Sequence, residues 1–283
     1  MLDYPALRAL AEIIRRGSFE AAAASLNLTP SAVSQRIKGL EERMGAVLIL
    51  RGPPATGTPE GLRLMQHLDQ VQLLEQGLAP TLRPVDGPAV LRIAVNADSL
   101  ATWFPAAMTA LPLRYDLVID DQDHAREWLR SGHVSAAITS DPDPVGGCDA
   151  YPLGHMRYLA MATPEFIRRH FPQGITPQAL ATAPAVIFNA KDALQARWAR
   201  LATGHRPSLA GHMIPSSEAF AKAVALGLGW GMIPQAMRTP GLHPLAGPPL
   251  DVPLYWQVTR AIAGAITPLT SAIRKRAADS LRP

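Results

Sequence analysis

The chain has 283 residues, of which 48% are hydrophobic and 18% charged, and this composition is typical of a soluble globular protein with two or three domains. No apolar run approaches the length of a bilayer span, and the start, MLDYPALRAL, lacks the features of a secretory signal. We therefore expect a cytoplasmic protein with no membrane partner. The single cysteine, Cys148, excludes an internal disulfide framework. The net charge of +4 is compatible with nucleic-acid binding but does not by itself indicate it.

The segment SFEAAAASLNLTPSAVSQRIKGLEERMG, residues 18–45, predicts two short helices joined by a tight turn. Ser18 is a good cap for the first helix, and Thr29 followed by Pro30 is a good start for the second. Gly45 can end the second helix in the left-handed conformation. A preceding amphipathic helix over residues 5–16 would complete a small three-helix core.

The second helix of this pair has two different faces. Its apolar residues recur at helical spacing: Val33, Ile37, Leu40 and Met44. The opposite face carries short polar side chains and a lysine: Ser31, Ser34, Gln35 and Lys38. Such a helix suits the DNA major groove, although an ordinary helix pair in a larger α-domain would show similar periodicity. The predicted DNA contacts are Ser18, Thr29, Pro30, Ser31, Ser34, Gln35, Arg36, Lys38 and Arg51, with the last three residues on phosphates.

A short apolar run, residues 47–50, precedes Arg51 and a tip rich in proline and glycine, which predicts a two-stranded wing. Thr58 and Pro59 then begin a long helix. Its apolar residues approach a heptad pattern: Leu64, Leu68, Val71, Leu74 and Leu78. The pattern predicts a dimerisation helix, and the alternative is a helix packed on its own domain.

The segment at 80–88 contains turn formers and predicts a linker. Beyond it, strand and helix patterns alternate, with strands expected at 91–95, 115–120 and 134–139 and helices at 99–110 and 164–170. Further helices are expected at 192–203, 216–226 and from Pro268. This alternation predicts an α/β domain with parallel sheets covered by helices on both faces.

These segments together resemble the LysR-type transcriptional regulators over essentially the whole length. The specific part is SFEAAAASLNLTPSAVSQRIKGLEERMGAVLILR, supported by SSEAFAKAVALGLGWGMIP near the C-terminus. The pieces VNADSLATWFPA, FPQGIT and LYW are similar to the ArgP/LysG subgroup, which senses basic amino acids and regulates their export. The wing departs from the family pattern, because Arg51 is its one strong phosphate donor.

The resemblance implies an N-terminal all-α winged helix-turn-helix over 1–58, a linker helix and hinge over 59–88, and an effector-binding domain over 89–283. The last would be a periplasmic-binding-protein-like fold, with subdomain I at about 89–161 plus 263–283 and subdomain II at about 162–262. It also implies homodimers that pair into tetramers on double-stranded operator DNA, with RNA polymerase as a further candidate partner.

Ligands of doubly wound sheets bind beyond the carboxyl ends of strands, which here selects the loops 96–99, 120–123 and 216–218. Ser99 matches a family position that commonly contacts the effector. A carboxylate would favour serines and helix N-termini, whereas an ammonium or guanidinium would favour aspartates. Aspartates at strand ends are also common helix caps. The candidate effector contacts are Asp98, Ser99, Asp121, Asp123, Asp141, Phe188, Asn189, Ser216 and Glu218.

We find no catalytic constellation, metal-ligand spacing or dinucleotide loop, so we expect no enzyme, no metal and no cofactor beyond a small effector. The predicted function is a DNA-binding regulator whose effector is lysine or arginine and which controls amino-acid export. The alternative is a family member for another effector, such as an organic acid. A solute-binding protein is a remote alternative, since it would leave residues 1–60 unexplained.

Overall fold

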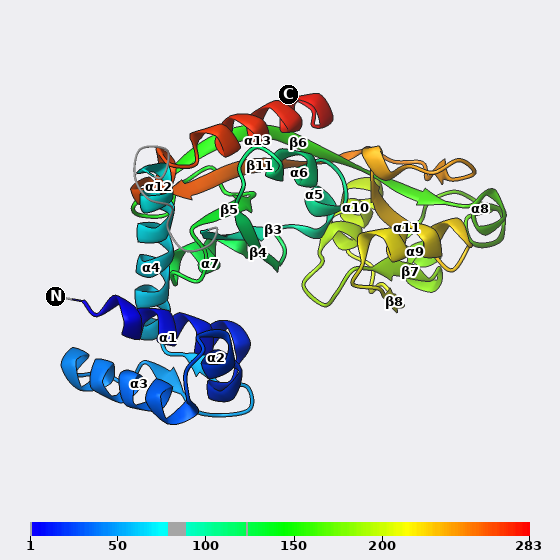
Figure 1. Cartoon of the computed structure of the whole chain (residues 1–283). Coiled ribbons are helices and arrows are strands. Elements are labelled where there is room, and N and C mark those ends of the chain that lie inside the picture. The colour runs from blue at the N-terminus through cyan, green and yellow to red at the C-terminus, as the bar shows by residue number, and fades with distance from the viewer. Residues whose placement is uncertain (1, 79–88, 123) are drawn as a thin grey trace.

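The computed structural model describes residues 2–78, 89–122 and 124–283. A small N-terminal domain lies at one end of the molecule and is joined by one long helix to an elongated second domain (Figure 1). The N-terminal domain and the joining helix consist of α1 (Tyr4–Arg16), α2 (Phe19–Ser25), α3 (Pro30–Met44), β1 (Ile49–Leu50), β2 (Thr56–Gly57) and α4 (Pro59–Leu78).

The predicted caps of the helix pair are confirmed. Ser18 Oγ accepts a hydrogen bond from the amide of Ala21 at 3.3 Å, and Thr29 Oγ1 accepts one from the amide of Ala32 at 3.2 Å. Gly45 ends α3 with φ of 65°, a conformation that a side chain disfavours. These local signals fix where the turn between α2 and α3 begins and ends.

The three helices bury one core, to which α1 contributes Leu7 and Leu10 and α3 contributes Val33, Ile37 and Leu40. The fourth residue of the predicted apolar face, Met44, is 43% exposed. That part of the prediction is wrong, because Met44 is the last residue of α3 and does not belong to the buried core. Strands β1 and β2 pair antiparallel and form the predicted wing.

Helix α4 packs first on the N-terminal domain and then on the second domain. Met65 and Leu68 are buried in the N-terminal core, whereas Leu73 is buried in the core of the second domain. The apolar residues predicted to form one dimerisation face of α4 therefore have different environments. Leu68 is buried in the core of its own chain, whereas Leu74 is 48% exposed. The side chain of Leu78 and the expected linker at 80–88 lie outside the described residues.

The second domain has two lobes connected by two long strands, β6 (Cys148–Ala162) and β11 (Leu250–Thr259) (Figure 1). Lobe I contains β3 (Val90–Val95), α5 (Ala97–Ala101), α6 (Phe104–Met108), β4 (Arg114–Ile119), α7 (Ala125–Arg130), β5 (Ala136–Thr139), α12 (Arg260–Ala263) and α13 (Thr267–Ser280). Lobe II contains α8 (Pro164–His170), α9 (Pro177–Thr182), β7 (Ala185–Ile187), α10 (Leu194–Thr203), β8 (Gly211–Met213), α11 (Ser217–Ala225), β9 (Gly231–Pro234), the 3-10 turn η1 (Gln235–Met237) and β10 (His243–Pro244).

The main sheet has the order β10-β6-β11-β5-β3-β4, and β9 also pairs with β6. Strand β3 is parallel to β4 and β5, but β6 and β11 are antiparallel to each other. The expectation of parallel sheets is thus wrong for the connecting strands, because one carries the chain out to lobe II and the other brings it back. Tyr255 of β11 already pairs with Thr139 of β5, so the chain returns to lobe I before residue 263.

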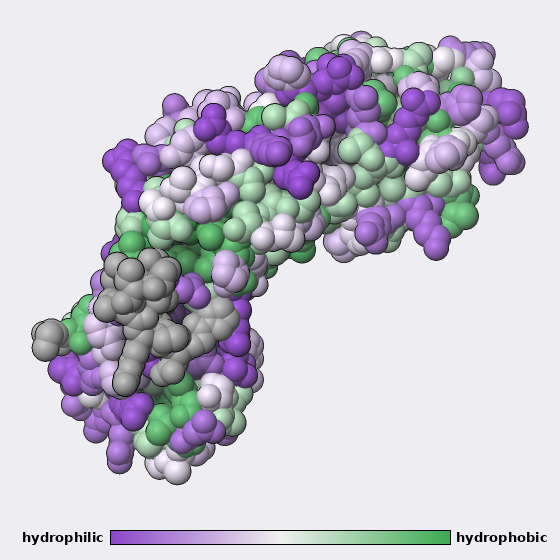
Figure 2. Space-filling model, turned by 45° about the horizontal axis from the view of Figure 1, so that its top comes forward, coloured by the Kyte–Doolittle hydropathy of each residue, from purple (hydrophilic) through white to green (hydrophobic). Residues whose placement is uncertain are grey.

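The helix expected over 99–110 is divided into α5 and α6. Pro105 lies in the first turn of α6, where its missing N–H is tolerated, whereas it would interrupt a single continuous helix. The space-filling view shows the bend between the two domains, with hydrophobic surface on the side of the second domain nearest the first (Figure 2).

Candidate functional sites

A cleft lies where the carboxyl ends of β3 and β4 face the loop between β7 and α10 and the start of α11. It has a cavity volume of about 50 Å³, within about 610 Å³ of space that includes the open solvent at its mouth. Polar residues from both lobes line it: Asn96, Asp98, Asp120, Asp121, Gln122, Tyr158, Asn189, Asp192 and Ser217. Its apolar wall includes Phe188, Phe220 and Met232.

Asp98 joins the two lobes at the floor of this cleft. Its carboxylate accepts a hydrogen bond from the Tyr158 hydroxyl at 2.7 Å and one from the Ser217 hydroxyl at 2.6 Å. Burial raises the pKa of Asp98, although both hydroxyl donors act to lower it. Burial and the nearby Asp98 charge raise the pKa of Tyr158 well above its ordinary value, so the phenol stays protonated and remains a donor.

Asp120 lies at the end of β4 on the lobe I side. Its carboxylate accepts hydrogen bonds from Trp128 Nε1 at 2.9 Å and from the amide of Asp121 at 2.8 Å. Lys191, from lobe II, places its Nζ 3.0 and 3.2 Å from the two carboxylate oxygens. Burial acts to raise the pKa of Asp120, but these donors outweigh it, so the net pKa is lowered and the group is ionised at neutral pH.

The loop between β7 and α10 is held by its own side chains. Asn189 Oδ1 accepts hydrogen bonds from the amides of Lys191 and Asp192, at 2.8 and 3.2 Å. The Asp192 carboxylate accepts hydrogen bonds from the amides of Phe188 and Leu194, each at 2.9 Å. Asn189 and Asp192 thus give the loop a fixed shape while presenting polar atoms to the cleft.

Asn96, at the end of β3, lines the same cleft, but unlike Asn189 and Asp192 its side chain makes no hydrogen bond within the described residues. It is 3% exposed, and neither its Oδ1 nor its Nδ2 has a hydrogen-bond partner among the described residues. A buried amide without partners is costly, on the order of 1–3 kcal/mol, and is uncommon in folded proteins. Because Asn96 lines the cleft, its amide is available to a ligand bound there.

The predicted effector residues divide into two groups. Asp98, Asp121, Phe188 and Asn189 line the cleft, whereas Ser99, Asp141, Ser216 and Glu218 are absent from its wall. Asp123 lies outside the described residues.

Each of the residues outside the wall has another environment. Ser99 is buried in α5, Asp141 forms an ion pair with Arg126, and Ser216 caps α11 by accepting a hydrogen bond from Ala219. Glu218 is exposed in the first turn of the same helix. Helical geometry explains the positions of Ser216 and Glu218, since it turns Ser217, and not its neighbours, toward the cleft.

Sequence reasoning missed Asn96, Asp120, Tyr158, Asp192 and Ser217 as individual site residues. Asn96 and Asp120 stand in the two predicted loops, so the rule for strand ends could have selected them. Tyr158 lies inside the long strand β6 and reaches Asp98 across 60 positions of sequence, for which no local signal exists.

The predicted recognition helix presents its polar face to solvent. Ser31, Gln35, Arg36 and Lys38 are exposed and Ser34 is half-buried, whereas Val33, Ile37 and Leu40 fix the helix from behind. Lys38 is 3.8 Å from Glu42 on the next turn, a weak contact between two exposed side chains. The face is therefore available to base edges and phosphates.

The wing and the N-terminus of α3 border one surface hollow, lined by Ser18, Pro30, Ser34 and Arg51 among others. The Arg51 guanidinium lies 5.2 Å from the centre of the Phe19 ring. This contact orients the wing arginine on the same side as the start of α3. Thr29 is exposed beside these residues, with its Oγ1 3.0 Å from Ser31 Oγ.

Within the described ranges, no three histidine, cysteine, aspartate or glutamate side chains gather in an arrangement that could hold a metal ion. The described helices also include none that is long and apolar enough to cross a membrane.

Comparison with known proteins identifies the family of both domains. Residues 5–62 match the bacterial regulatory helix-turn-helix protein, lysR family, and residues 88–278 match the LysR substrate binding domain. The transcriptional regulator LysG of Mycobacterium bovis is 41% identical over 99% of this chain and 95% of its own length. The regulator ArgP of Pseudomonas aeruginosa is also 41% identical, over 99% of this chain and 98% of its own length.

Two solved structures are similar over the full length. The crystal structure of ArgP from Mycobacterium tuberculosis has a TM-score of 0.83 and 40% identity, covering 100% of this chain and 99% of that one. Full-length LysG from Corynebacterium glutamicum with bound effector Arg has a TM-score of 0.70 and 35% identity, and each chain is covered completely. With a helix-turn-helix that presents a polar face and a cleft between two lobes, this chain belongs to the LysR family of bacterial transcriptional regulators.

Proposed function

We propose that this protein regulates transcription in response to a basic amino acid, arginine or lysine, bound in the cleft between the two lobes. The observation that carries the proposal is the charge of the cleft. Among the residues that the structure describes, its lining includes four carboxylates, those of Asp98, Asp120, Asp121 and Asp192, and no arginine or lysine, and the Lys191 ammonium that pairs with Asp120 offsets one of the four. Such a site favours a ligand with more than one positive group.

A basic amino acid meets these conditions. Its α-ammonium and its side-chain cation can each contact a carboxylate, because an ionised carboxylate has about four acceptor positions and the hydrogen bonds at Asp98 and Asp192 leave some of these positions open. The Asn96 amide can donate to the ligand carboxylate. The bound arginine in the similar LysG structure supports the same class of ligand.

On DNA, we propose that Ser34 and Gln35 contact base edges, while Lys38 and Arg51 contact phosphates. The partly exposed side of α4, with Leu74, is the proposed dimer contact, and dimers would pair into tetramers that bind a two-fold operator.

Effector binding would change the relative geometry of the two lobes, and hence the relative positions of the paired DNA-binding domains. Only a ligand that binds the two states with different affinity can drive this shift. Control of amino-acid export is the physiological role we propose.

Calorimetry with arginine, lysine, glutamate and benzoate tests the ligand class. We expect saturable binding of the two basic amino acids only, and weaker binding of arginine in Asp120→Asn, because a charge-assisted contact to the guanidinium is lost. Binding of either acid, with no binding of the basic amino acids, would show that the protein is a regulator for another effector.

A further inference from the structure

Lys191 already places an alkylammonium group on one of the carboxylates that line the cleft. Its Nζ lies 3.0 and 3.2 Å from the two oxygens of Asp120, and the two residues belong to opposite lobes. The pair therefore bridges the mouth of the proposed effector site.

The two partners of this bridge are built differently. The Asp120 side chain is 12% exposed and is fixed by Trp128, whereas the Lys191 side chain is 52% exposed. Asn189 holds the backbone at Lys191, so the loop is fixed while the four-carbon side chain is free to rotate away. Asp120 is thus the fixed acceptor, and Lys191 is the removable donor.

Resting on the proposed function, we propose that Lys191 is an intrachain competitor that occupies the acceptor for the side-chain cation of the effector. The effector then binds only by displacing the Lys191 ammonium from Asp120.

This competition lowers the affinity for both basic amino acids by the same factor, because the Lys191–Asp120 pair that must be broken is the same for either ligand. A lysine ligand exchanges one ammonium for another at Asp120 and gains little at that contact. An arginine ligand replaces the ammonium with a planar guanidinium, which can donate two parallel hydrogen bonds to one carboxylate. Arginine therefore gains more at Asp120 than lysine does, whether or not Lys191 is present.

A different role for Lys191 would give the opposite result. If its ammonium bound the carboxylate of the effector, removal of the charge would weaken the binding of both amino acids. The sign of the change in affinity distinguishes a competitor from a ligand-binding residue.

The test is calorimetry of the full-length protein with arginine and lysine, comparing wild type, Lys191→Met and Lys222→Met. Lys222 is exposed in α11 of the same lobe, so its substitution removes an equal charge without touching Asp120. We expect Lys191→Met to bind lysine about two- to fivefold more tightly, the size expected for a partly exposed ion pair. The gain for arginine should be the same factor, because either ligand displaces the same ammonium, and Lys222→Met should bind as wild type does.

A second comparison isolates the Asp120 contact. In the Asp120→Asn background, the further change Lys191→Met should leave affinity unaltered, because the two effects share one contact. Thermal unfolding without ligand checks that every variant is folded.

Unchanged or weaker binding in Lys191→Met, with normal binding in wild type, would overturn the inference and leave the proposed function standing. An equal gain in Lys222→Met would also overturn it, since the effect would then be one of net charge. Absence of binding in all variants would reject the proposed function and this inference together.

Discussion

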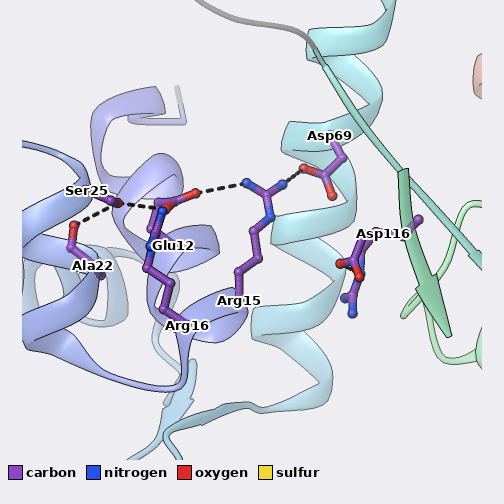
Figure 3. Close-up of polar contacts among 8 residues, drawn as sticks. Glu12, Arg15, Arg16, Ala22, Ser25, Asp69 and Asp116 are labelled. Carbon is purple, nitrogen blue, oxygen red and sulfur yellow. Dashed lines mark hydrogen bonds and ion pairs between the residues drawn. The ribbon is translucent and has the colours of Figure 1, made fainter. Parts of the chain in front are cut away.

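Arg15 of α1 forms an ion pair with Asp69 of α4, at the point where the DNA-binding domain meets the rest of the molecule. Arg15 also contacts Glu12 of its own helix at 3.2 Å, so its guanidinium lies between two carboxylates (Figure 3). On the effector-domain side, Arg92 of β3 pairs with Asp116 of β4 at 2.7 Å. The charges of both residues act on Asp69, which is 2% exposed. The orientation of the DNA-binding domain on α4 thus depends on a buried charge.

Removal of Arg15 should be costly. Arg15→Met leaves the Asp69 carboxylate buried without its partner, and we expect the free energy of unfolding to fall by about 1–3 kcal/mol. The matched control is Arg16→Met on the same helix, since Arg16 is 48% exposed and its loss should change stability by less than about 0.5 kcal/mol. Urea denaturation measures both, and equal effects would show that the Asp69 contact contributes nothing.

The pH dependence of stability should reveal Asp69. Burial raises its pKa from 3.8 to about 6, against the opposing effects of Arg15 and Arg92, while Asp116 adds to the rise. Between these values the folded state binds a proton that the unfolded state lacks, so this group's contribution to stability falls as pH rises from 3.8 toward 6.

Asp69→Asn cannot titrate, and the stability of wild type relative to this variant should therefore decline over the same interval. Denaturation at a series of pH values measures the difference. A constant difference would contradict the raised pKa, and a difference that grows with pH would mean that Arg15 dominates over burial.

Substitutions on α3 should distinguish residues that recognise bases from residues that contact phosphates. Gln35→Ala should reduce discrimination between operator and random DNA by about 1–3 kcal/mol, because a base-edge contact is lost. Lys38→Ala should weaken binding to all DNA and reduce the salt slope by about 0.9, because one phosphate contact is lost. Fluorescence anisotropy at several salt concentrations measures both, with Lys275→Ala in α13 as the charge control. Operator affinity equal to that of wild type in both α3 variants would remove this face from the DNA interface.

Asn96 offers a test in which stability and binding should change in opposite directions. Asn96→Leu removes a buried amide that has no partner among the described residues, so the free energy of unfolding should stay constant or rise by up to about 2 kcal/mol. Arginine affinity should fall by about five- to thirtyfold through loss of the proposed contact. Asn189→Ala is the contrasting variant, since it loses two hydrogen bonds to the backbone and should be destabilised. Undiminished affinity in Asn96→Leu would exclude this amide from the site.

Two helical glycines should respond oppositely to alanine. A Cβ on Gly61 of α4 would lie 2.1 Å from the carbonyl oxygen of Leu48, which would force the wing away from the helix. A Cβ on Gly39 of α3 meets nothing within 4 Å. Gly39→Ala should therefore stabilise by about 0.5–1 kcal/mol, through higher helix propensity. Gly61→Ala should destabilise by about 1–3 kcal/mol, the usual cost of overpacking. Thermal unfolding of the two variants provides the comparison.

The sequence was most informative where its signals are local. The caps at Ser18 and Thr29 and the left-handed Gly45 each depend on residues within one turn, and all three were predicted correctly. Helix α8 was likewise expected with the bounds it has, because a threonine cap and a proline define its start.

Contacts between distant segments could not be predicted in the same way. Hydrogen bonds at the cleft join Asp98 to Ser217, 119 positions away, and Asp120 to Lys191, 71 positions away. The rule for strand ends selected the lobe I loops, but it cannot say which residue of a loop faces inward. The antiparallel pairing of β6 with β11 was missed for a similar reason, since only the path of the chain between lobes determines it.

Cys148 has a practical consequence. It is the one cysteine of the chain, is 2% exposed, and has a pKa raised by burial, so its thiol is a poor nucleophile at neutral pH. A maleimide dye should therefore leave the native wild-type protein unlabelled. Cysteines introduced at the wing tip and at the outer end of lobe II would accept a donor and an acceptor fluorophore without first removing any native residue. Energy transfer between them would then report how far the DNA-reading end moves when an amino acid enters the molecule.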